Sequence, residues 1–182
     1  MPNGFGTGLS PTFGKVWDGR TTEEFMSRLH SFLASCLETC YSVERSGRSP
    51  VIMEIGVENP AIDQLLTDFG ERQFVYMTAF NPQSTSLSPQ ENEQRQRELC
   101  ERVQDRNYRY LMGWATPKAG AWDPERCIFV PGMSHSEAAE LCALFRQDGA
   151  VVGAQGQPPR LLFTDVRLRD DLRNILHHCV LD

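Results

Sequence analysis

Polar side chains follow directly after the most apolar strand-like segment of the chain. Residues 74–80 are rich in β-branched and aromatic side chains, which predicts a central strand covered on both faces. Asn81 and Pro82 end this strand, because proline lacks an amide hydrogen and restricts the residue before it. The carboxyl end of the strand therefore presents Thr78, Asn81 and Ser84, at a position where α/β proteins commonly bind ligands.

These three residues join five others in a candidate ligand site. The predicted ligand-binding set is Thr78, Asn81, Ser84, Glu91, Arg95, Trp122, Glu125 and Gln147. In this hypothesis the amides of the 81–91 turn and helix start receive an anion, Arg95 pairs with it, and Trp122 stacks on a ring. Such a pocket would suit a small anionic or nucleotide-like ligand. Glu125 is the obvious general acid or base, but it lacks an evident second partner, so binding is expected rather than catalysis.

The same residues also have a purely structural interpretation. Asn81 and Ser84 build a turn by bonding local amides, Glu91 closes a helix cap, and Trp122 covers an edge of the core. The sequence leaves both interpretations open.

Other motifs that carry chemistry are weak. The glycines of residues 4–8 precede any strand and lack the lysine of a phosphate-binding loop. The four histidines form no ligand pattern with the cysteines, and His177 and His178 suit the end of a helix better than a metal. Cys127 with His135 could in principle form a nucleophile and base, but burial of Cys127 in a strand is favoured. No metal and no cofactor is expected.

Composition places the chain among ordinary globular proteins. It has 182 residues, 40% of them hydrophobic and 23% charged, with a net charge of -6. This charge argues against nucleic acid as a partner, and no apolar run approaches the roughly 20 residues of a membrane helix. Six scattered cysteines without an export signal predict free thiols and a cytoplasmic location.

Helix caps, strand-like runs and turn residues predict one α/β domain over residues 21–182, preceded by a loose Gly/Pro-rich arm at 1–20. The predicted helices are 21–40, 60–69, 88–106, 134–145 and 168–179. The predicted strands are 51–55, 74–80, 108–115, 127–131, 150–154 and 160–163. Helices between strands imply parallel crossovers and the two hairpins imply antiparallel pairs, so a mixed sheet of about six strands with helices packed on it is expected.

Several short patterns recur with the spacing of one known family. They are the run Ile55 to Leu66, Thr78 to Pro82 with Ser84, Glu91 and Asn92 with Arg95, Trp122 with Pro124 and Glu125, and Phe145 with Gln147. Over residues 22–163 the chain therefore resembles the bacterial family called domain of unknown function 3293. The resemblance implies a shared fold and a bacterial cytosolic protein, and it implies no particular activity.

An alternative to ligand binding is a non-catalytic interaction module. The arm carries Phe5, Phe13 and Trp17, and the helix at 88–106 is lined with charged residues. Either could contact a protein partner or a second copy of the chain, giving a homodimer.

Overall fold

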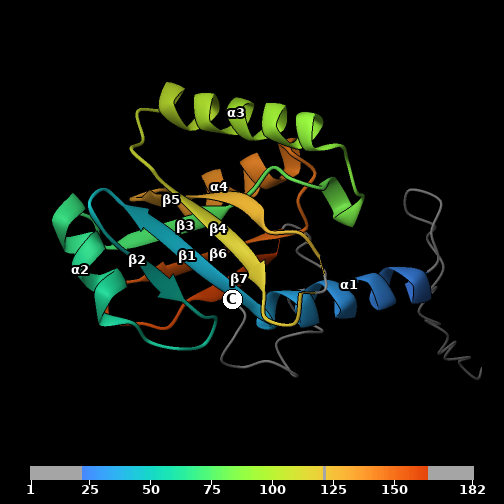
Figure 1. Cartoon of the computed structure of the whole chain (residues 1–182), viewed down its shortest axis with the longest axis horizontal. Helices are drawn as coiled ribbons and strands as arrows, with labels where there is room; N and C mark the ends of the chain where they lie inside the picture. The colour runs from blue at the N-terminus through green and yellow to red at the C-terminus, as the bar shows by residue number, and fades with distance from the viewer. Residues whose placement is uncertain (1–21, 121, 164–182) are drawn as a thin grey trace, which may run out of the picture.

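The computed structural model describes residues 22–120 and 122–163 (Figure 1). The predicted arm at 1–20 and the predicted helix at 168–179 lie outside the described residues. The elements are α1 Thr22–Leu37, β1 Thr39–Arg45, β2 Arg48–Met53, α2 Pro60–Phe69, β3 Gln73–Met77, a 3-10 turn Pro82–Ser84, α3 Pro89–Asp105, β4 Leu111–Pro117, β5 Glu125–Pro131, α4 His135–Leu144, β6 Gly149–Ala154 and β7 Arg160–Phe163.

The strands form one sheet with helices packed on it, which confirms the predicted α/β fold. In the part of the chain that the structure describes, the sheet has seven strands in the order β2-β1-β4-β5-β3-β6-β7, and all their pairs are antiparallel. The predicted mixed sheet was therefore wrong in its parallel pairs. The reason is that the helices do not join neighbouring strands: α2 links β2 to β3, which do not pair, and α4 links β5 to β6, which both pair with β3.

The seventh strand is β1, which was not predicted from the sequence; its first two residues fall at the end of the predicted helix 21–40. Cys40 continues the helical spacing of Cys36, but the helix ends at Leu37 and Cys40 lies in β1. Burial alternates along this strand: Thr39, Tyr41 and Val43 are buried, whereas Cys40 and Ser42 are half-buried. This alternation is typical of a strand with one covered face.

Local signals at the helix ends are confirmed. Asn59 caps α2 by accepting from the Ala61 amide, and Gly70 ends the helix in the left-handed conformation. Ser88 and Glu91 form a reciprocal capping box at the start of α3, as do Ser134 and Glu137 at α4.

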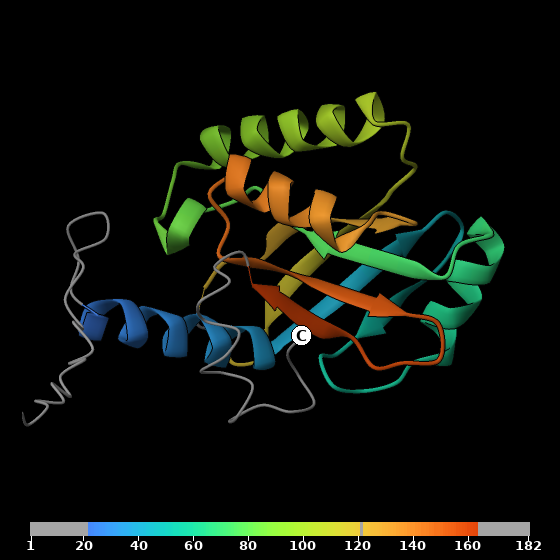
Figure 2. The same ribbon diagram turned by 180° about the vertical axis from the view of Figure 1, so that it is seen from behind.

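Helices cover both faces of the sheet (Figures 1 and 2). Ile62 and Leu66 of α2 pack with Phe74 and Tyr76 of β3 on one face. On the other face, residues of α3 and α4 pack with Val75 and Met77 of the same strand. The prediction that this central strand is buried on both faces is confirmed. Among the described residues, no helix has the length and apolar character required to cross a membrane.

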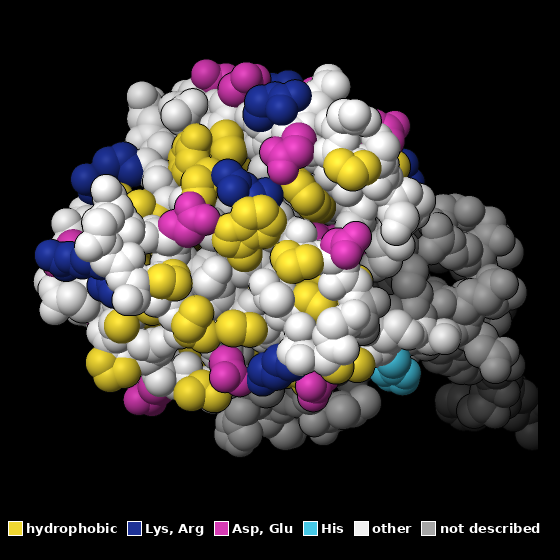
Figure 3. Space-filling view, viewed as in Figure 1, with side chains coloured by type: hydrophobic (Ala, Val, Ile, Leu, Met, Phe, Trp, Pro, Cys, Tyr) yellow, Lys and Arg dark blue, Asp and Glu magenta, His cyan; other side chains and the backbone are white. Residues whose placement is uncertain are grey.

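Over β2, β1 and β4, one region of the second face has no helix of residues 22–120 or 122–163 packed on it. Ile52, Ser42 and Trp114 lie in register there, followed by Arg126 of β5. The indole of Trp114 donates to Glu44, and the Arg126 guanidinium stacks on its ring at 4.7 Å. Hydrophobic side chains on this side of the molecule are interleaved with charged ones (Figure 3).

Candidate functional site

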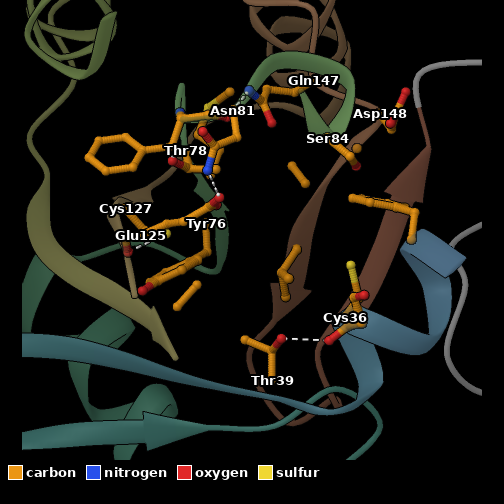
Figure 4. Close-up of a pocket in the computed structure, with 18 of the residues that line it drawn as sticks. Cys36, Thr39, Tyr76, Thr78, Asn81, Ser84, Glu125, Cys127, Gln147 and Asp148 are labelled. Carbon is orange, nitrogen blue, oxygen red and sulfur yellow. Dashed lines mark hydrogen bonds between the residues drawn. The ribbon is translucent and has the colours of Figure 1, made fainter. Parts of the chain in front are cut away.

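A cavity of about 310 Å3 lies at the carboxyl end of β3, on the face of the sheet that α1 and α2 cover (Figure 4). Its walls come from the end of α1, from strands β1, β3, β4, β5, β6 and β7, and from the 78–86 segment. Six of the eight predicted site residues line it: Thr78, Asn81, Ser84, Trp122, Glu125 and Gln147. Glu91 and Arg95 do not.

Glu125 places a carboxyl group in this cavity from the first position of β5. Its Oε1 accepts a 2.7 Å hydrogen bond from Nδ2 of Asn81, whereas Oε2 accepts no hydrogen bond from the described residues. Burial raises the pKa of the Glu125 carboxyl, and the Asn81 hydrogen bond opposes part of that effect. The Glu125 carboxyl is thus desolvated, oriented at one oxygen and unbonded by the described residues at the other.

A hydrogen-bond network fixes the amide of Asn81. Its Oδ1 accepts from the Leu87 amide at 3.1 Å and from Nδ2 of Asn92 at 2.9 Å, while its own backbone amide donates to Oδ1 of Asn92. Because Oδ1 is occupied by donors, Nδ2 must point toward Glu125. Asn81 therefore acts as a positioning residue, and the buried Asn92 of α3 holds it in turn.

The backbone just before Asn81 is held by side chains instead of a neighbouring strand. Gln96 of α3 accepts from the Ala79 amide at 2.8 Å, and Nε of Arg95 donates to the Ala79 carbonyl at 2.8 Å. Nε2 of Gln147 donates to the Phe80 carbonyl at 2.7 Å. These contacts satisfy polar groups that would otherwise be lost where the strand ladder ends.

Arg95 thus has a different place from the one the sequence predicted. It belongs to α3, which covers the face of the sheet opposite the cavity. Besides the Ala79 carbonyl, it bonds the Phe145 carbonyl and lies 5.8 Å from the centre of the Phe145 ring. Its guanidinium ties the 78–81 segment to the end of α4, and Arg95 does not line the cavity.

Glu91 also has a structural place. It is exposed, and its Oε2 accepts from both the amide and the hydroxyl of Ser88 in the capping box. These hydrogen bonds lower the pKa of the Glu91 carboxyl. Glu91 and Glu125 were predicted for the same site, yet their surroundings shift their pKa values in opposite directions.

The turn that forms the rim contains unusual backbone angles. Asn81, Gln83 and Ser84 have φ values of 43°, 53° and 58°, in the left-handed region that favours glycine. Arg146 has φ 54° and meets this turn, since its guanidinium donates to Gln83 at 2.7 Å and its carbonyl accepts from the Gln83 amide. Left-handed non-glycine residues cost energy, and they cluster where a precise shape is required.

Thr78 completes the turn and offers little to a ligand. Its hydroxyl donates to the Arg126 carbonyl at 2.7 Å and accepts from the Phe80 amide at 3.0 Å. Trp122 packs against the core on the α1 and α2 side while lining the cavity. Glu91, Arg95 and Thr78 therefore fit the structural interpretation of the polar set, whereas Glu125 fits the ligand-site interpretation.

The thiols and phenols of the cavity are held in their neutral forms. Burial is the main cause that raises the pKa of Cys36 to about 12 and that raises the pKa values of Cys127 and Tyr76. Cys127 is buried in β5, as expected, and a protonated buried thiol is a poor nucleophile. Among the described residues, no three His, Cys, Asp or Glu side chains lie close enough to hold a metal ion.

The sequence missed several residues of this site. Tyr76, Cys36 and Asp148 line the cavity, and the buried Asn92 and Gln96 support its rim from α3. Polar residues on the core-facing side of α3 were the available signal. Asn92 and Gln96 fall at spacings of seven and three from the buried Leu99, which places them on the covered face of the helix.

Comparison with known proteins gives one finding. No curated protein and no solved structure matches the chain. One family model does match, over a segment that includes the end of β3, all of α3, Glu125 and Gln147. Residues 77–151 match the family described as "Protein of unknown function (DUF3293)", in agreement with the resemblance drawn from the sequence.

Proposed function

We propose that this protein binds a small organic molecule in the cavity at the end of β3. Glu125 is the recognition group, and Asn81 positions it. The observation that carries the proposal is the Glu125 carboxyl, which is desolvated inside a cavity and held by Asn81 at one oxygen, with the other oxygen available to a ligand. A cavity of about 310 Å3 lies near the lower end of the range of about 300–1,000 Å3 for small-molecule sites.

The construction of the rim also supports binding. A left-handed turn at Asn81, Gln83 and Ser84 is stabilised by side chains from α3 and from the end of α4. Such a turn costs conformational energy that a simple connection between β3 and α3 would not require. A rigid rim lowers the cost of ordering the site when a ligand enters.

Binding fits the cavity better than catalysis does. Glu125 could exchange a proton, but Cys36, Cys127 and Tyr76 stay protonated and provide no activated nucleophile. The interaction-module alternative depends on the arm, which lies outside the described residues, and on α3. It stays a prediction from the sequence, as do the cytoplasmic location and bacterial origin.

A variant that fills the cavity tests this proposal. Ala115 of β4 lines the cavity, while its neighbour Thr116 is exposed. Ala115→Leu should abolish binding of molecules detected by saturation-transfer NMR in a screen of small metabolites, and Ala115→Val should weaken it. Thr116→Leu is the matched control in the same strand and should retain every hit.

Thermal midpoints of all three variants verify folding. Hits that bind the parent and Ala115→Leu equally would contradict the proposal, and so would a parent protein that binds no compound in the screen.

A further inference from the structure

Two acidic residues line the cavity. Glu125 of β5 and Asp148, just before β6, approach it from opposite walls (Figure 4). Among the described residues that line the cavity there is no lysine, arginine or histidine. The Glu125 carboxylate would repel an anion that enters this space and attract a cation.

The two carboxylates also influence the pKa values of two thiols in the cavity wall. After burial, which is the largest cause, Glu125 and Asp148 both contribute to the raised pKa of the Cys36 thiol. Glu125 likewise contributes to the raised pKa of Cys127. Two thiols on different elements, α1 and β5, thus experience a negative potential.

Nearby basic side chains are engaged elsewhere. Arg95 bonds the Ala79 and Phe145 carbonyls, and Arg146 donates to Gln83 at the rim. Arg126 stacks on Trp114, on the opposite face of the sheet from the cavity. None of these guanidinium groups lines the cavity.

The side-chain donors closest to the centre of the sheet bond groups within the protein. The hydroxyls of Tyr76, Tyr41 and Thr39 donate to the carbonyls of Ser42, Cys36 and Ser35. Thr78 and Asn81 donate to the Arg126 carbonyl and to Glu125. Oε2 of Glu125 accepts no hydrogen bond from the described residues, so a ligand that pairs with Glu125 must bring a donor of its own.

Aromatic rings form much of the remaining wall. The residues are Phe32, Tyr41, Tyr76, Phe80 and Trp122. Tyr41 and Tyr76 pack edge to face with ring centres 5.6 Å apart, which leaves ring surface as their contribution to the cavity. Aromatic faces attract organic cations and also accommodate apolar groups.

We propose that the ligand is an organic cation, an amine with a small apolar or aromatic body, whose ammonium group pairs with Glu125. This inference rests on the proposed function and replaces the anionic ligand expected from the sequence. The ammonium donates to Oε2 of Glu125 and compensates its buried charge, and the apolar body of the amine lies against the rings.

Three probes of similar size and different charge test the inference. They are phenethylamine, phenethyl alcohol and 3-phenylpropionate, each titrated into the labelled full chain and followed by NMR at cavity residues. The amine should bind at least about tenfold more tightly than the carboxylate, the scale of one charge-assisted hydrogen bond.

Glu125→Gln keeps an acceptor for Asn81 and removes the charge. It should weaken amine binding by about tenfold while changing alcohol binding by less than about twofold. Glu98→Gln, at an exposed position of α3, is the control and should change neither.

The possible failures are distinguishable. If 3-phenylpropionate or the alcohol binds as tightly as the amine, or if Glu125→Gln binds the amine normally, the organic-cation inference is overturned and the cavity remains a binding site. If none of the three probes shifts cavity resonances, the inference and the proposed function both fall.

Discussion

The two faces of the sheet use their polar residues in different ways. On the α3 and α4 face, Asn92, Gln96 and Arg95 turn toward the protein and bond the backbone of the 78–81 segment. On the α1 and α2 face, Glu125 turns into a cavity with one oxygen unbonded by the described residues. The side chains of α3 that hold the 78–81 segment therefore lie on one face of the sheet, and the Glu125 carboxyl lies on the other.

A core substitution on the face that α3 and α4 cover should have the largest effect on stability. Leu141 of α4 is fully buried, whereas Leu144 on the same helix is 57% exposed. We expect Leu141→Ala to lower the free energy of unfolding by about 2–5 kcal/mol, through lost burial and a residual cavity. Leu144→Ala should cost less than about 1 kcal/mol. Urea titrations measure both, and equal midpoint shifts would refute the assignment of this face as the closed core.

Arg95 should have the next largest effect. Arg95→Ala removes hydrogen bonds to two backbone carbonyls, so we expect a loss of about 1.5–3 kcal/mol in the free energy of unfolding. Arg97→Ala, at an exposed position on the same helix, should cost less than about 0.5 kcal/mol. If Arg95→Ala folds as stably as Arg97→Ala but loses ligand binding, Arg95 is a ligand residue and the division between the faces is wrong.

Relief of backbone strain at the rim should raise the free energy of unfolding, by less than the losses expected above. Ser84 has φ 58°, whereas Ser86 is not among the residues with positive φ. Ser84→Gly should raise the free energy of unfolding by up to about 1 kcal/mol, because glycine accepts the left-handed conformation without steric cost. Ser86→Gly should leave stability unchanged or lower it. Chemical denaturation of the pair measures the difference, and a destabilised Ser84→Gly would argue against strain in this turn.

The buried carboxyl should produce a modest dependence of stability on pH. The raised pKa of Glu125 means that the folded protein holds this proton to higher pH than the unfolded chain does. Its contribution to stability therefore falls as pH rises from the ordinary glutamate value through the raised folded value. Glu125→Gln should gain stability relative to the parent between pH 4 and pH 7 in thermal melts. A constant difference across this range would show that Glu125 is not desolvated.

Local patterns predicted much of the fold. Helix starts at Asn59, Ser88 and Ser134 follow from side chains that bond amides within three residues, so no tertiary information is needed. The strand β1 was missed because no glycine or proline separates it from α1 and Cys40 keeps the helical spacing. The antiparallel sheet order depends on which strands meet in space, and connection lengths alone did not determine it.

Local sequence patterns also predicted part of the site. Thr78, Asn81 and Ser84 lie together in sequence, and the end of β3 does carry the cavity. The bond from Asn81 to Glu125 spans 44 positions and requires β5 to lie beside β3. Arg95 was predicted for the pocket because it follows the turn in sequence, but the sequence did not specify which face of the sheet α3 covers.

The decisive measurement is a carbon-detected NMR titration of the glutamate carboxyl groups, because it gives the pKa values of Glu125 and Glu91 in the same sample. Burial should make Glu125 titrate above the usual glutamate pKa, and the capping hydrogen bonds should make Glu91 titrate below it. Asn81→Ala should raise the Glu125 pKa further, since it removes the hydrogen bond that favours the carboxylate. A Glu125 carboxyl that titrates at or below the usual value in the parent protein would contradict the desolvated, Asn81-oriented site on which the proposed function depends.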